Sequence, residues 1–210
     1  MIVVTTPMCK QIVEWAGLND FKVNKFPDQE EGDFAILLSE SKVEMDSLAI
    51  KLNTFSQIKE SIKTVSNVLF EKNLIDKAIG DAEIEAIFDD YKDNDIQFAV
   101  LGEDEFNKIR ESNKDKKAKV YSEFLKDIVS DIGATVVDFK YNKDGNDEGD
   151  PNLDYSYLVY PDYLEDEVLK RENLDCDEFK SIKIPSHNNI SKDPILKAES
   201  RYDTLINEMK

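Results

Sequence analysis

The chain has 210 residues, of which 45 are aspartate or glutamate and 27 are lysine or arginine, so its formal net charge at pH 7 is -18. Such a charge repels a phosphate backbone and an anionic membrane surface, and we expect neither nucleic acid nor a membrane as a partner. The length is sufficient for one α/β domain with a substantial core, or for two small lobes that share an interface.

The first part of the chain predicts four short strands, over residues 1–5, 21–24, 34–38 and 48–52. The apolar run of residues 34–38 is uninterrupted and bounded by turn residues, which is typical of a strand buried on both faces of a parallel sheet. A short helix opens at Thr6-Pro7 after the first strand and continues over residues 11–18, and Gly17 is placed to end it. This order is that of a βαβ unit.

The middle of the chain predicts helices that alternate with strands. Apolar residues recur at helical spacing from Phe55 to Leu69, after a capping-box pattern at residues 54–57, so we expect a long amphipathic helix there. Further helices are predicted over residues 74–91, from residue 103 onward and over residues 120–132, and buried strands over residues 98–101 and 134–139. A basic stretch is typical of a solvated connection between helices and comprises Lys114, Lys116, Lys117 and Lys119.

This order of elements indicates an α/β protein with a mostly parallel, Rossmann-like sheet flanked by helices. A polar, acidic loop over residues 142–152 is the clearest discontinuity in the chain. We therefore expect an α/β domain over residues 1–141. Residues 142–210 are expected to form the acidic loop and a C-terminal α+β extension that packs on this domain. No internal repeat is visible in the sequence.

The compartment and the state of the thiols follow from two further features. The start of the chain lacks a basic segment followed by an apolar core and a cleavage site, and no apolar run reaches the roughly 20 residues of a membrane span. From this we expect a cytoplasmic protein. The two cysteines, Cys9 and Cys176, lie in dissimilar contexts, so two free thiols are expected and not a disulfide.

Cys9 is the candidate nucleophile. It falls in the first turn of the first predicted helix, for which Thr6 is a suitable N-cap and Pro7 a suitable first residue. The free amides and the positive end of the helix dipole favour a thiolate at such a place. The alternative is inert packing, the more common role of a cysteine beside a strand. The single histidine, His187, is distant in the sequence, and a Cys/His pair is not indicated.

Polar residues follow several of the predicted strands at their carboxyl ends, where ligands of open parallel sheets gather. The alternative is that they only cap helices. None of these loops carries a glycine-rich phosphate motif, so we expect neither a dinucleotide nor a P-loop site and assign no cofactor. The residues expected to line one crevice for a small ligand are Thr5, Thr6, Met8, Cys9, Ser39, Glu40, Ser41, Gly102 and Glu103.

No metal site is expected. Residues 144–150 match the early positions of an EF-hand loop, but position twelve is Tyr155 in place of the bidentate glutamate. Two separated cysteines and one histidine do not have the spacing of a structural zinc site.

Two resemblances extend this interpretation. The segments DFAILLSE (residues 33–40) and TFSQIKESI (54–62), with residues 48–53 between them, resemble one lobe of the cobalamin- and siderophore-type binding proteins, whose long helix is often the spine of the molecule. Residues 2–18 resemble the first strand and helix of that lobe, so the resemblance covers roughly the first 80 residues. It implies a binding protein, although this chain has no export signal and only a short second half. No binding residue is carried over.

The second resemblance is to small proteins of methanogenic archaea, and the many Asp, Glu, Lys, Asn and Ile residues are typical of an AT-rich genome. One of these proteins assembles the iron-guanylylpyridinol cofactor and holds its pyridinol precursor as a thioester on an N-terminal cysteine. The resemblance implies that Cys9 is an acyl acceptor. Three hypotheses thus remain open: a non-catalytic binding protein, a thiol-dependent protein of cofactor biosynthesis, and an interaction subunit. The third would dock a protein partner, or a second copy, through residues 142–210.

Overall fold

The structure is a computed structural model and describes residues 1–92, 96–137, 154–172, 179–186 and 191–210. Within these ranges eight strands form two four-stranded sheets, and every strand pair is parallel. The prediction of an α/β fold with parallel strands and flanking helices is confirmed, but the strands form two sheets where one was expected. The described helices include none that is long and apolar enough to cross a bilayer.

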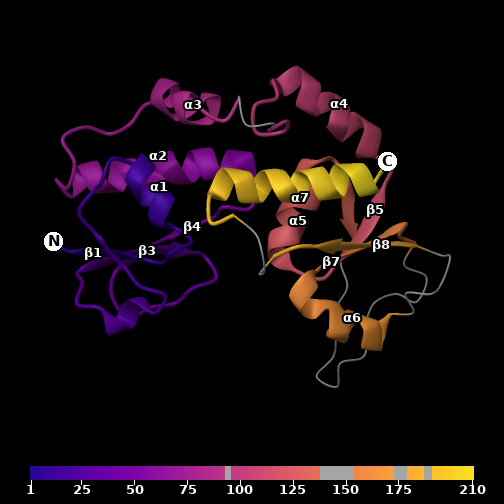
Figure 1. Cartoon of the computed structure of the whole chain (residues 1–210), viewed down its shortest axis with the longest axis horizontal. Helices are drawn as coiled ribbons and strands as arrows, with labels where there is room; N and C mark the ends of the chain where they lie inside the picture. Colours follow the sequence, from indigo (N-terminus) through magenta and orange to yellow (C-terminus); the bar gives the residue numbers. More distant parts are fainter. Residues whose placement is uncertain (93–95, 138–153, 173–178, 187–190) are drawn as a thin grey trace. The chain divides into compact units, whose positions relative to one another are not determined.

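The chain forms two compact units (Figure 1). Unit 1 comprises Met1–Val100 and Ser191–Glu199, and unit 2 comprises Leu101–Ile190 and Ser200–Lys210. The helix α7 (Pro194–Glu208) contributes its residues up to Glu199 to unit 1 and the remaining residues to unit 2. The boundary expected at residues 141/142 lies outside the described residues, as do the acidic loop, Cys176 and His187.

Unit 1 holds a sheet of order β2-β1-β3-β4. Figure 1 shows α1 and α2 on one face of this sheet. The four residues from Phe34 to Leu37 are buried, as expected from the apolar run. The elements of the unit are β1 (Val3–Thr5), α1 (Lys10–Trp15), β2 (Lys22–Val23), η1 (Pro27–Gln29), β3 (Phe34–Leu38), β4 (Ser47–Ile50), α2 (Phe55–Glu71) and α3 (Asp81–Asp89).

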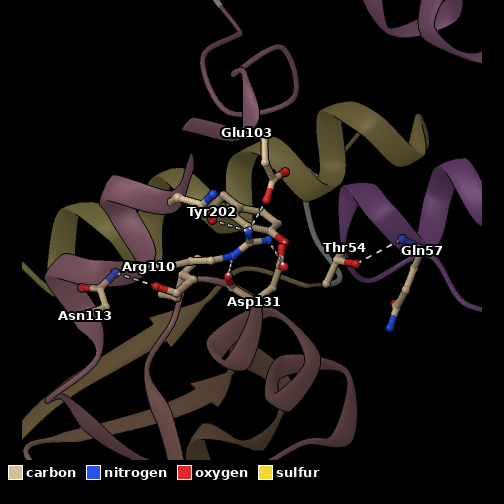
Figure 2. Close-up of polar contacts among 9 residues, drawn as sticks. Thr54, Gln57, Glu103, Arg110, Asn113, Asp131 and Tyr202 are labelled. Atoms are coloured by element: carbon tan, nitrogen blue, oxygen red, sulfur yellow. Dashed lines mark hydrogen bonds and ion pairs between the residues drawn. The ribbon is translucent and has the colours of Figure 1, made fainter. Parts of the chain in front are cut away.

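The long helix α2 begins and packs as its sequence predicts. Thr54 is its N-cap, and the Thr54 hydroxyl accepts a hydrogen bond from the Gln57 N–H at 3.2 Å (Figure 2). The Gln57 side chain in turn accepts from the Asn53 N–H at 3.1 Å. Four residues at helical spacing are fully buried against the sheet and α1, and each contributes about 1.5–3 kcal/mol by leaving water. They are Ile58, Ile62, Val65 and Leu69.

Unit 2 holds a sheet of order β6-β5-β7-β8. Figure 1 shows α5 and α6 on opposite faces of this sheet, so that both faces are covered, as a parallel sheet requires. The remaining elements of the unit are α4 (Glu103–Asn113), β5 (Lys117–Val120), α5 (Glu123–Asp131), β6 (Thr135–Val137), β7 (Tyr157–Pro161), η2 (Asp162–Leu164), α6 (Glu165–Arg171) and β8 (Lys180–Ile184).

The two units repeat one topology, although the sequence shows no repeat. In each unit the first strand lies inside the sheet, and a helix leads from it to the edge strand on one side, before the chain continues to the two strands on the other side. Gly17 and Gly133 follow the equivalent helices α1 and α5 with φ angles of +101° and +91°. Leu18 and Ala134 then donate their N–H groups to Val13 and Val129, which is the Schellman ending of a helix. The predicted role of Gly17 is confirmed.

Two predicted elements differ from the structure. Residues 98–101 form no strand, because the N–H groups of Phe98 and Ala99 donate to the Glu199 carboxylate at 2.9 Å and not to a neighbouring strand. The helix predicted over residues 74–91 is shorter and begins after Gly80. The Glu83 carboxylate accepts from the Gly80 N–H at 2.6 Å, and this bond fixes the start of α3.

The basic stretch is a third correction. Lys117–Val120 is the strand β5, and Lys119 is only 4% exposed. Its ammonium group lies 2.8 Å from the Glu172 carboxylate, which also accepts hydrogen bonds from the hydroxyls of Tyr121 and Tyr155. A lysine that would be costly to bury alone is stabilised inside the sheet by this partner.

Candidate functional site

The strand order of unit 1 brings the predicted loops together. β1 lies between β2 and β3 in the sheet. The connection from β1 runs to β2 on one side, and the chain then continues to β3 on the other side of β1. The carboxyl ends of β1 and β3 therefore form a topological switch point. Thr5 pairs with Ile36 across these strands, and the Thr5 hydroxyl donates to the Ile36 carbonyl at 2.7 Å. The segments that follow the two strands, residues 6–9 and 39–41, are therefore neighbours.

The polar side chains at this edge differ in their environment. The Thr6 Oγ1 atom is buried and has no hydrogen-bond partner among the described residues. The Ser39 hydroxyl donates to the Glu40 carboxylate at 2.8 Å, and the Ser41 N–H closes the turn by donating to the Leu38 carbonyl at 2.9 Å. The sulfur of Met8 lies 3.8 Å from the Lys197 ammonium nitrogen. The Thr6 side chain acts on the neighbouring Cys9 thiol, whose pKa it lowers, but its hydroxyl makes no hydrogen bond of full geometry to a described residue.

Cys9 is fully buried in this structure. It is 0% exposed and precedes α1, a helix of only 6 residues, without capping it through its side chain. Burial raises the pKa of the Cys9 thiol to about 11, and the charge of Glu40 acts in the same direction. The thiol is therefore protonated at neutral pH, and the helix dipole does not produce a thiolate. The implied role as an acyl acceptor loses its physical basis.

Gly102 and Glu103 belong to unit 2. No strand ends at Leu101, so these residues do not stand at the carboxyl edge of a sheet as expected. Glu103 begins α4, and its carboxylate pairs with Arg110 at 2.8 Å. Arg110 also donates to the Asp131 backbone carbonyl and carboxylate, at 2.9 and 3.0 Å, as Figure 2 shows. This network fastens α4 to the end of α5 and has a structural role.

Unit 2 has a switch point of its own, between β5 and β7, which the sequence did not indicate. Ser122 follows β5 as the N-cap residue of α5, but its hydroxyl caps nothing and is buried without a partner among the described residues. Asp162 follows β7, and its carboxylate accepts from the hydroxyl of Ser186, which follows β8. The edge was missed because residues 120–132 were interpreted as one helix. A serine directly before an acidic helix start was the available signal.

Arg201 of α7 lies beside this second edge. It is 6% exposed, and its Cζ atom lies 4.4 Å from the centroid of the Phe124 ring in the first turn of α5. Its Nε–H is buried without a hydrogen-bond partner among the described residues. Burial lowers the pKa of Arg201 to about 10, while the charges of Tyr163 and Asp162 oppose this shift. The guanidinium is therefore charged at neutral pH.

The described residues contain no group of three or more His, Cys, Asp or Glu side chains that could hold a metal ion. The donors that the two edges offer are hydroxyls, a thiol, single carboxylates and one guanidinium. They suit hydrogen bonding to an organic molecule better than coordination of a cation.

Comparisons with known proteins place the fold. No family model and no curated protein matches the sequence. Among solved structures, an Mn-bound mutant form of a periplasmic metal binding protein from Candidatus Liberibacter asiaticus is similar over 100% of both chains, with a TM-score of 0.56 and 9% identity. The Cd-bound form of that protein has a TM-score of 0.55 and 7% identity, again over 100% of both chains.

A Zn(II)-bound mutant variant of AdcAII from Streptococcus pneumoniae has a TM-score of 0.52 and 11% identity, over 100% of this chain and 99% of the other. At such identities the likeness concerns the fold and not the site. This chain therefore shares its fold with these solved structures.

Proposed function

We propose that this chain is a non-catalytic binding protein that holds a small ligand at the carboxyl ends of its parallel strands. One observation carries the proposal. In both units a hydroxyl within two residues of the end of the inner strand is buried and unpaired among the described residues, Thr6 in unit 1 and Ser122 in unit 2. Both stand at the switch point of their sheet.

The energetics favour a ligand at these hydroxyls. A buried hydroxyl without a hydrogen bond costs about 1–3 kcal/mol, and a folded chain leaves few such groups. The described side chains contain three buried polar atoms without a hydrogen-bond partner: the two hydroxyls and the Nε–H of Arg201. Arg201 contacts Phe124 of α5, the helix that begins directly after Ser122. A ligand with polar atoms at the strand ends would supply the missing partners.

The chemistry of the described residues favours binding over catalysis. The thiol of Cys9 is buried and protonated at neutral pH, so it is not poised for attack. The proteins of similar fold include metal binding proteins, and a metal ion is accordingly one class of ligand to be tested. A small organic ligand or cofactor precursor fits the described donors better. The cytoplasm remains the proposed compartment.

Thermal unfolding of the full chain tests the proposal. The panel contains MnCl2, ZnCl2 and EDTA, together with small organic acids, amines and nucleosides. A ligand at 100 times its Kd stabilises the folded state by about 2.7 kcal/mol, so at least one compound should raise the Tm measurably. Thr6→Val and Ser122→Ala should reduce that rise, whereas Ser112→Ala, which removes an exposed hydroxyl of α4, should not. A wild-type Tm that no compound shifts would contradict the proposal.

A further inference from the structure

We propose that unit 2 binds the carboxylate group of a small organic ligand between the guanidinium of Arg201 and the first turn of α5. This inference rests on the proposed function and names the chemistry of the ligand at one of the two edges. It uses residues of unit 2 alone.

The first argument is that Arg201 has no carboxylate partner among the residues that the structure describes. The chain contains three arginines, and the other two pair with acidic residues, Arg110 with Asp131 and Glu103 and Arg171 with Glu167. Arg201 is the most buried of them, yet the described residues place no carboxylate within 4.0 Å of its guanidinium. In a chain with 45 acidic residues and 27 basic ones, a buried cation without an ion pair to any described residue indicates a place for an external anion.

The second argument is the position of that cation. The Phe124 ring, 4.4 Å from the guanidinium carbon, belongs to the second residue of α5, so the positive charge lies at the start of a nine-residue helix. The Ser122 carbonyl accepts from the N–H groups of Leu125 and Lys126, both at 3.1 Å. Glu123 and Phe124 are the first two residues of α5, and their N–H groups have no carbonyl partner within the helix. They and the helix dipole attract the same anion as Arg201.

The third argument selects the class of anion. The guanidinium presents parallel N–H groups that match a planar carboxylate, and the unpaired Ser122 hydroxyl can donate to it as well. The charge of Asp162 acts on Arg201. A second negative charge on the ligand would be repelled by Asp162, so a singly charged carboxylate suits the site better than a doubly charged phosphate.

The test uses the full chain in chloride buffer at constant ionic strength, with sodium acetate and inorganic phosphate as probes. Acetate at about 100 mM, well above a millimolar Kd, should raise the wild-type Tm by about 5 to 10 °C, and phosphate should raise it less. Arg201→Met should abolish the acetate effect. Arg171→Met, which removes a paired arginine of the same unit, should retain it and thereby controls for a general effect of the salt.

The unliganded variant gives an independent measurement. Without probe, Arg201→Met should have a Tm equal to or above that of the wild type, because the substitution removes a buried charge that has no partner. A lower Tm would make Arg201 a structural cation and overturn the inference. An acetate effect that is absent, or that phosphate matches, would also overturn it. If acetate has no effect while another compound stabilises the wild type and Arg201→Met to the same degree, the proposed binding function stands and only this site is refuted.

Discussion

The state of Cys9 decides between a binding protein and a thiol-dependent one, and its reactivity can be calculated from its burial. The pKa of the thiol is raised from 9.0 to about 11. At pH 8 the thiolate fraction therefore falls from about 10% for a free thiol to about 0.1%. Since only the thiolate reacts, alkylation in the folded chain should be at least about 100-fold slower than in the unfolded chain. Full burial of the side chain slows the reaction further.

The assay is a thiol titration of Cys176→Ser, in which Cys9 is the only thiol. The rate is measured between pH 7 and pH 10 in native buffer and in guanidinium chloride, which serves as the internal reference for an accessible thiol. A native rate within about tenfold of the denatured rate at pH 7 would refute the packing interpretation and restore Cys9 as a candidate nucleophile.

The same shift makes stability depend on pH. The folded-state pKa lies above the unfolded value, so the contribution of Cys9 is fully present below pH 9.0 and is lost as the pH rises to about 11. The loss amounts to about 2 to 3 kcal/mol, and Cys9→Ala should remove it from a series of urea unfolding curves. Equal slopes of stability against pH in the two proteins would contradict the assigned pKa.

Three further predictions concern the fold. Lys119→Met should lower the free energy of unfolding, measured with denaturant, by about 3 to 5 kcal/mol, because it leaves the Glu172 carboxylate buried without its cation. The double variant with Glu172→Gln should recover most of that loss. Gly133→Ala should cost about 2 to 4 kcal/mol, since its φ is +91° and a Cβ would lie 2.4 Å from a carbonyl oxygen of α4, whereas Gly102→Ala should cost little. Thr54→Ala should cost about 1 kcal/mol through the lost N-cap of α2, and an unchanged Tm would contradict that role.

Local signals predicted a large part of unit 1. The apolar run that became β3, the capping pattern of α2 and the glycine that ends α1 each depend on residues close in sequence, and the structure contains all three. The carboxyl ends of β1 and β3 could also be located from the sequence, because the end of a predicted strand can be recognised without knowledge of its neighbours. The strand order then brought the two segments together.

Other elements depend on partners that are distant in the chain. Lys119 carries a charge and would be expected at the surface, and its ion pair with Glu172 is what allows it to be buried in β5. Phe98 and Ala99 have the apolar character of a strand, but the Glu199 carboxylate takes their N–H groups. The sequence could not predict either outcome, because the free energy that decides it comes from a contact between distant segments.

The sequence by itself determined the α/β class, the parallel strands and the polar loop after β3, because periodicity and turn residues act over a few positions. The tertiary structure alone decided that Cys9 is buried, which raises the pKa of its thiol, and that the strands form two sheets of one topology. It also decided that the guanidinium of Arg201 lies over the ring of Phe124, in the first turn of α5, without a carboxylate partner among the described residues. Burial and the absence of a partner are properties of packing, and no local pattern of residues encodes them.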